Sequence, residues 1–205
     1  MENKLPIRKN IRLPKHNYSA PGAYFITVCT QDKRHILSRI VGEGSVFPIT
    51  GTDTMHTSEA NGISNYTVGE GSALPKKTIV ELSPCGRIIE KTIGQISVKY
   101  NDVSVDRYVI MPNHVHLLLS KKSSYGRADP SPTGETNIID VIGWFKFTTA
   151  KEIARMKISG IASLWQRSFY DHIIRNEQDY YEIARYIEDN PLMWEKDSLY
   201  SPILN

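Results

Sequence analysis

Two histidines separated by a single valine, His114 and His116, have the spacing that most directly allows chemistry in this chain. Side chains alternate between the faces of a β-strand, so both imidazoles share one face if the segment is extended. Neutral imidazole is the commonest metal ligand, and two on one face can bind a divalent cation. A pair of ordinary histidines on a half-buried strand is the alternative interpretation. The context favours a metal site, because a Pro-Asn turn precedes the pair and a leucine run follows it.

The flanking sequence predicts the elements that must position this pair. Aromatic and β-branched residues predict strands at 23–30, 103–111 and 114–120, a short strand near 78–82, and an extended or strand segment at 163–175. Helical spacing and capping residues predict helices at about 84–99, from about 137 past Ile153, and at 176–189. The resulting order predicts an α+β fold, a ferredoxin-like sandwich with helices on one side of a mainly antiparallel sheet.

Length and composition indicate one domain that spans 1–205 and carries two flexible loops. The hydrophobic content of 40% is enough for an ordinary core. Residues 41–76 are rich in Gly, Ser, Thr and Asn, and the string Val-Gly-Glu-Gly-Ser occurs there at 41–45 and again at 68–72. We interpret this segment as an inserted flexible loop, since solenoid repeats need longer units. Residues 121–136 form the second predicted loop.

The charge distribution indicates an anionic partner more clearly than the net charge of +3 does. The N-terminal segment is a basic arm, which is typical of segments that bind phosphate groups. The helix predicted from about residue 137 has a basic flank that includes Lys146. Cys29 and Cys85 are too few for a disulfide scaffold and are expected to be free thiols. No apolar stretch approaches the ~20 residues of a membrane helix and no signal-peptide core is evident, so we expect a cytoplasmic protein without membrane association.

The motifs together resemble a known family. Residues 113–117 (Asn-His-Val-His-Leu) are similar to the histidine–hydrophobic–histidine (HUH) signature of single-tyrosine transposases. Residues 165–175, 186–191 (Tyr-Ile-Glu-Asp-Asn-Pro) and 12–27 resemble the REP-associated tyrosine transposase branch of this IS200-like superfamily. The resemblance covers most of the chain outside the two loops, and several motifs in the expected order make it far more specific than a lone His-x-His.

The resemblance implies metal-dependent nicking and joining of single-stranded DNA, as in DNA transposition. A tyrosine oxygen attacks a phosphodiester and leaves a 5′-phosphotyrosine and a free 3′-hydroxyl, with the metal offsetting charge. By resemblance Tyr170 is the nucleophile, and His114 and His116 bind Mg²⁺ or Mn²⁺. A glutamine one helical turn after the tyrosine often supplies a third ligand, but Ile174 stands there in this chain. His172 and Gln166 are the remaining candidates, and the sequence does not choose between them.

The expected partner is single-stranded or hairpin DNA with REP-like palindromes. The residues expected to contact it are Arg8, Lys9, Arg12, Lys15, Lys146 and Arg167. The other tyrosines of the last helix, Tyr180, Tyr181 and Tyr186, are expected to be packing residues, and Trp165 to lie in the core. A hairpin-binding protein that has lost catalysis is the principal alternative, and an unrelated metal hydrolase that uses activated water is another. A homodimer is compatible with the sequence, which does not decide between monomer and dimer.

Overall fold

A four-stranded antiparallel sheet organises the computed structural model, which describes residues 16–41, 79–123, 136–157 and 163–202. The sheet contains β1 (Gly22–Cys29), β4 (Val103–Ile110), β5 (His114–Lys121) and β6 (Tyr170–Ile174), in the order β4-β5-β1-β6. Three predicted features lie wholly or mostly outside the described residues. They are the basic arm with Arg8, Lys9, Arg12 and Lys15, nearly all of the insert at 41–76, and most of the loop at 121–136. The order β1-α1-β4-β5-α2-β6 and this strand order confirm the predicted ferredoxin-like α+β fold.

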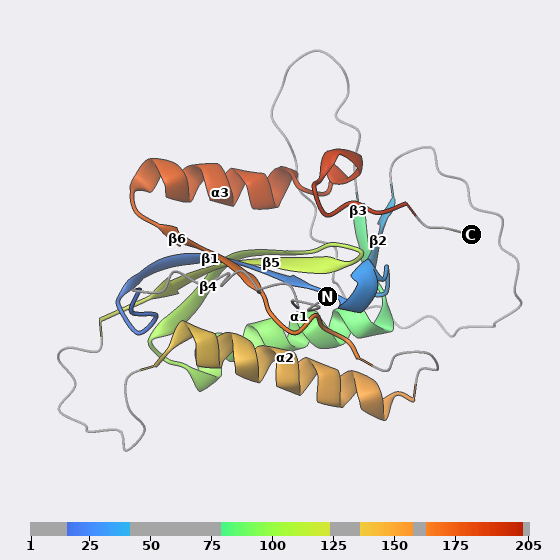
Figure 1. Ribbon diagram of the computed structural model, residues 1–205, viewed down its shortest axis with the longest axis horizontal. Helices are drawn as coiled ribbons and strands as arrows, with labels where there is room; N and C mark the ends of the chain where they lie inside the picture. Colours follow the sequence, from blue (N-terminus) through green and yellow to red (C-terminus); the bar gives the residue numbers. More distant parts are fainter. Residues whose placement is uncertain (1–15, 42–78, 124–135, 158–162, 203–205) are drawn as a thin grey trace, which may run out of the picture.

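Helices α1 (Pro84–Lys99) and α2 (Ile138–Arg155) pack against one face of this sheet (Figure 1). Ser83 caps α1 by accepting a hydrogen bond from the Gly86 N–H, and Pro84 occupies the first turn, where no backbone donor is needed. Alternate residues of the strands meet the apolar stripes of both helices. The resulting core includes Tyr24, Ile26, Val28, Ile89, Ile93, Val115, Leu117, Leu119, Ile142, Phe145 and Trp165. The predicted core position of Trp165 is confirmed, and its Nε1–H donates to Thr149 Oγ1 at 2.8 Å.

The third helix, α3 (Glu177–Asp189), covers the opposite face of the sheet, together with the short helix η2 (Trp194–Lys196) (Figure 1). The expectation that all helices lie on one side is therefore corrected. A smaller apolar cluster fills this second interface and includes Val109, Met111, Leu118, Ile187 and Trp194. Polar contacts add to it, because Tyr180 donates to Asp106 Oδ2 at 3.0 Å and Arg107 pairs with Glu188 at 2.9 Å. Helix α3 is thus attached to the strand β4 at two points.

Two local features differ from the sequence-based predictions. Strand β2 (Ser38–Val41) was not predicted, and it pairs with β3 (Ile79–Leu82) as a separate two-stranded sheet. The segment 163–175 is a strand only over β6, with an isolated bridge between Trp165 and Thr30. Lys146 explains the interruption, because its ammonium donates to the carbonyls of Gln166, Arg167 and Ser168 at 2.7–3.1 Å. Those carbonyls therefore face α2 instead of a neighbouring strand.

Among the residues that the structure describes, no helix is both long enough and apolar enough to cross a membrane.

Candidate metal centre

The two histidines of β5 point to the face of the sheet that α3 covers. His114 and His116 are 0% and 2% exposed, and their Nε2 atoms lie 3.0 Å apart. On the neighbouring strand β1, Thr27 stands opposite His116 and Cys29 opposite His114. The expected same-face geometry of a His-x-His strand is therefore present. The two imidazole nitrogens lie close enough to share either a proton or a single cation.

Hydrogen bonds from neighbouring residues define the tautomer of His114. Asn113 Nδ2 donates to the Leu199 carbonyl at 3.0 Å, so Asn113 Oδ1 faces His114 Nδ1 at 2.8 Å. An amide oxygen only accepts, so His114 carries its proton on Nδ1 and directs the Nε2 lone pair toward His116. The Thr27 hydroxyl lies 2.8 Å from His116 Nδ1 and can donate or accept. When Thr27 accepts, the Nε2 lone pairs of both histidines are available to one cation.

A carboxylate and a phenol complete the cluster from two other elements. Asp197 follows η2, its side chain is fully buried, and its Oδ2 lies 4.0 Å from His114 Nε2. One potential ligand atom each of His114, His116 and Asp197 fall within 4.8 Å of one another. The Tyr186 hydroxyl, from α3, donates to Asp197 Oδ2 at 3.1 Å and lies 3.4 Å from His116 Nε2. Strand β5, α3 and the segment after η2 therefore converge on one point.

Asn190 supplies a test of whether these residues suit a cation. It lies one helical turn after Tyr186, is 2% exposed, and donates through Nδ2 to Asp197 Oδ2 at 2.7 Å. Its Oδ1 is buried and has no hydrogen-bond partner among the described residues. An unsatisfied buried oxygen costs free energy unless another partner takes the bond. Two imidazoles, a carboxylate and an amide oxygen are a donor set that Mg²⁺ or Mn²⁺ accepts, so the residues fit a divalent metal.

Burial keeps the histidines neutral, which is the form that binds metal. Desolvation lowers the pKa of His114 from 6.5 to about 3, and the positive charges of Lys33 and His35 add to this effect. Desolvation likewise lowers the pKa of His116 well below its usual range, with His114 contributing and Asp197 opposing. Desolvation and the Asp197 carboxylate raise the pKa of Tyr186 to about 12. Tyr186 is therefore a neutral phenol, and the nearby carboxylate accepts its hydrogen bond.

The other predicted site residues lie at different distances from this centre. Tyr170 is 51% exposed on β6 and stands opposite Thr27, which in turn stands opposite His116. Tyr170 and His116 therefore share a face, two strand spacings or about 10 Å apart at the backbone. The role of Tyr170 as nucleophile stays a prediction. His172 Nε2 instead lies within 3.1 Å of both Asp179 oxygens, so the structure pairs it with α3.

Three further predictions concern residues around the 165–169 loop. Gln166 is bound through its backbone N–H to the Cys29 carbonyl at 2.9 Å, and its role as a ligand stays a prediction. Arg167 is exposed, as a DNA contact would require. Lys146 donates to the carbonyls of Gln166, Arg167 and Ser168, and its predicted role as a DNA contact stays a prediction.

Sequence reasoning missed three members of the cluster. Tyr186 was expected to be a packing residue, and its ring does pack against Phe25 and His116, but its hydroxyl also contacts the cluster, which was not predicted. A local signal did exist, because Tyr186 and Asn190 have the tyrosine-plus-four spacing that was sought after Tyr170. Asp197 carried no recognisable signal, since it follows the last predicted helix in a segment without periodicity.

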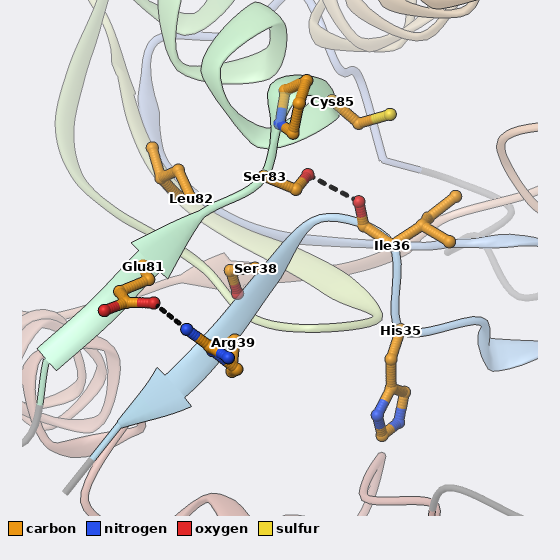
Figure 2. A pocket seen from close by; sticks show the side chains of 9 residues that line it. His35, Ile36, Ser38, Arg39, Glu81, Leu82, Ser83 and Cys85 are labelled. Carbon is orange, nitrogen blue, oxygen red and sulfur yellow. Dashed lines mark hydrogen bonds and ion pairs between the residues drawn. The ribbon is translucent and has the colours of Figure 1, made fainter. Parts of the chain in front are cut away.

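A separate pocket of about 470 Å³ lies beside the small sheet formed by β2 and β3 (Figure 2). Its polar groups are largely engaged, because Arg39 pairs with Glu81 at 2.5 Å and Ser83 donates to the Ile36 carbonyl at 2.7 Å. His35 lines the pocket and lies 3.0 Å from Ser201 Oγ through its Nε2. The pocket lies close to the histidine pair, because the rings of both His35 and His114 contact the ring of Trp194.

Comparison with known proteins gives this geometry a family context. An uncharacterized protein from Haemophilus influenzae is 29% identical over 204 residues, which cover 94% of this chain and 93% of the relative. Two solved structures are each 15% identical in sequence to this chain. One is a REP-associated tyrosine transposase bound to a REP hairpin, and the match has a TM-score of 0.47 and covers 85% of this chain and 68% of that one. The other is a putative transposase from Deinococcus radiodurans, and the match has a TM-score of 0.41 and covers 87% of this chain and 97% of that one. The family model described as "Transposase IS200 like" matches residues 78–190, more than half of the chain. The chain therefore belongs to the IS200-like transposase family.

Proposed function

We propose that this protein is a metal-dependent enzyme that nicks and joins single-stranded DNA through a phosphotyrosine intermediate. Membership of the IS200-like family implies DNA transposase activity. The observation that carries the finer proposal is the convergence of two neutral histidines and a buried carboxylate, whose potential ligand atoms lie within 4.8 Å of one another, with the Tyr186 hydroxyl beside them. A binding-only protein would not require this buried polar cluster, which is costly to maintain.

The proposed reaction uses the phenol oxygen as the nucleophile. The phenol gives its proton to the Asp197 carboxylate, which already accepts its hydrogen bond, and its oxygen attacks a phosphorus atom. A bond forms between tyrosine and the 5′-phosphate, and the bond to the 3′-oxygen breaks. This 3′-oxygen takes up a proton from water and leaves as a 3′-hydroxyl. The reverse attack by a 3′-hydroxyl joins a strand and releases the tyrosine. A divalent cation bound by His114, His116, Asp197 and Asn190 would supply charge neutralisation at the phosphate.

The protein's own residues prepare this reaction in three ways. His114 and His116 are held neutral and oriented by Asn113 and Thr27, so neither has to lose a positive charge before it acts as a ligand, and Thr27 can accept the His116 proton on Nδ1 when Nε2 binds the cation. Asp197 accepts the hydrogen bond of Tyr186 and so orients its oxygen at the edge of the cluster. Tyr186 is 42% exposed, which leaves the phenol accessible to a DNA strand from outside.

The geometry favours Tyr186 over Tyr170 as the nucleophile, because its hydroxyl already lies 3.4 Å from His116 Nε2. The test compares Tyr186→Phe, Tyr170→Phe and Tyr181→Phe on single-stranded REP-like hairpins with Mn²⁺. Tyr181 is a matched control, since it lies on the same helix and is 65% exposed. We expect the denaturation-resistant protein–DNA band to disappear only in Tyr186→Phe. Loss of the band only in Tyr170→Phe would restore the original assignment.

Hairpin DNA is the proposed substrate, as in the relative whose structure contains a REP hairpin. Exposed Arg167 and the basic arm (Arg8, Lys9, Arg12 and Lys15) would contact its phosphates, so affinity should fall as salt concentration rises. If the parent protein formed no adduct with any of several hairpins and metals but still bound them, the binding-only alternative would replace the catalytic proposal.

A further inference from the structure

Asn113 contacts two separate parts of the metal centre with the two ends of one amide. Its Oδ1 lies 2.8 Å from His114 Nδ1, on its own strand. Its Nδ2 lies 3.0 Å from the Leu199 carbonyl and 3.3 Å from Ser201 Oγ, both in the C-terminal segment. The side chain is 1% exposed, so no water competes freely for these bonds.

The backbone of Asn113 is held as firmly as its side chain. Its carbonyl accepts a hydrogen bond from the Thr30 N–H at 2.9 Å, and it lies 3.0 Å from Thr30 Oγ1, whose single proton it shares with the Arg34 carbonyl. Thr30 is fully buried at the end of β1, so Asn113 is fixed relative to the central sheet. A group fixed in this way can serve as an anchor for a segment that lacks regular structure.

The segment that Asn113 holds, residues 197–201, carries the carboxylate of the metal centre. The Leu199 N–H donates to Asp197 Oδ1 at 2.6 Å, and the Tyr200 N–H donates to the Asp197 carbonyl at 2.9 Å. These bonds make the segment a compact turn in which the position of Leu199 determines that of Asp197. Ser201 adds a second attachment, 3.0 Å from His35 Nε2.

We propose that Asn113 is a positioning residue that couples the histidine motif to the C-terminal segment. One end of the amide holds His114 in the metal-binding tautomer, and the other end keeps Asp197 beside the histidine pair. This inference rests on the proposed metal centre. It extends the functional unit beyond residue 190, where the match to the family model ends.

Two measurements that do not depend on catalysis test the coupling. The first is the Mn²⁺ dissociation constant from calorimetry, in a cycle of Asn113→Ala, Asp197→Asn and the double variant. The second is amide hydrogen exchange of Leu199 and Tyr200. Asn101→Ala, an exposed turn asparagine, is the matched control. We expect Asn113→Ala to weaken Mn²⁺ binding about tenfold or more, as outer-sphere substitutions do, and to accelerate exchange at both amides.

The double variant distinguishes the effect of the Asn113 amide on Asp197 from its effect on His114. If Asn113 acts through Asp197, adding Asn113→Ala to Asp197→Asn should weaken binding by less than about threefold, because contacting pairs are not additive. A fully additive loss, or unchanged exchange at Leu199 and Tyr200, would overturn the coupling. If Asn113→Ala does not fold, Ser201→Ala decides by the same two measurements, with a smaller effect expected. Absence of Mn²⁺ binding in the parent would refute the metal centre, whereas the exchange data would still decide whether Asn113 holds the segment.

Discussion

The two faces of strand β5 differ most at its start, where His114 and His116 alternate with Val115 and Leu117. Val115, Leu117 and Leu119 face α1 and α2 and belong to the main apolar core. His114 and His116 face α3, where rings, carboxylates and amides from three elements meet. A period-two strand can therefore serve stability with one set of side chains and chemistry with the other.

The difference shows how each face tolerates change. The apolar face stabilises the fold in proportion to the apolar area that it buries, and this stabilisation is distributed over many contacts. The polar face depends on a few directional bonds, and each lost partner leaves a buried polar group unsatisfied. We therefore expect substitutions on the first face to change stability and those on the second to change activity.

The largest expected effect is on the polar face. The double substitution His114→Ala/His116→Ala should abolish DNA cleavage, because both imidazole ligands are lost, and should leave hairpin affinity within a few-fold of the parent. Adduct formation and fluorescence anisotropy measure the two quantities. His172→Ala is the matched control, because its partner is Asp179, and it should still cleave. Cleavage by the double variant would refute the metal centre.

On the apolar face, Leu117→Ala should lower the free energy of unfolding by about 2–5 kcal/mol, the usual cost of a cavity in a packed core. Leu117 is completely buried and immediately follows His116. Chemical denaturation measures the stability, and calorimetry should show unchanged Mn²⁺ affinity in the folded variant. A substantial loss of affinity at full folding would show that the two faces are not independent.

Acid should destabilise the polar face selectively. The pKa of His114 is about 3 in the fold against 6.5 ordinarily, and that of His116 is also lowered, so the unfolded chain binds more protons between these values. Stability should therefore fall progressively as pH decreases from about 6.5 toward 3, and be insensitive to these groups above that range. Denaturation at pH 7 and pH 4.5 should show a smaller difference in His114→Ala/His116→Ala than in the parent. An equal difference in both proteins would contradict this cause.

The smallest effect is expected away from both faces. Replacing residues 42–78 by a short Gly-Ser turn should leave stability nearly unchanged, because Val41 and Ile79 already pair directly across β2 and β3. Thermal unfolding of the shortened protein measures the effect. A large decrease in the midpoint would show that the replaced segment contributes to the fold, against its composition.

Much of the fold and half of the centre follow from local sequence patterns. The spacing of His114 and His116 places them on one face wherever the strand lies, and Ser83-Pro84 determines where α1 begins. Hydrophobic periodicity identified the helices and the four strands of the main sheet, because burial of one face is a property of neighbouring residues. Strand β2 was not predicted, because its few residues pair with β3, more than 35 positions away in the chain.

Only the tertiary structure decided which groups join the histidines. Tyr170 and Tyr186 both carry a phenol, and the family resemblance implied the chemistry for the first, whereas the second was expected to be a packing residue. The packing of α3 over the histidine face brings the Tyr186 hydroxyl to His116, 70 positions away in sequence. Asp197 arrives through a turn held by the Asn113 amide, 86 positions from Leu199. Such contacts depend on the global arrangement of the elements, because the residues adjacent to Asp197 do not determine where the rest of the chain lies.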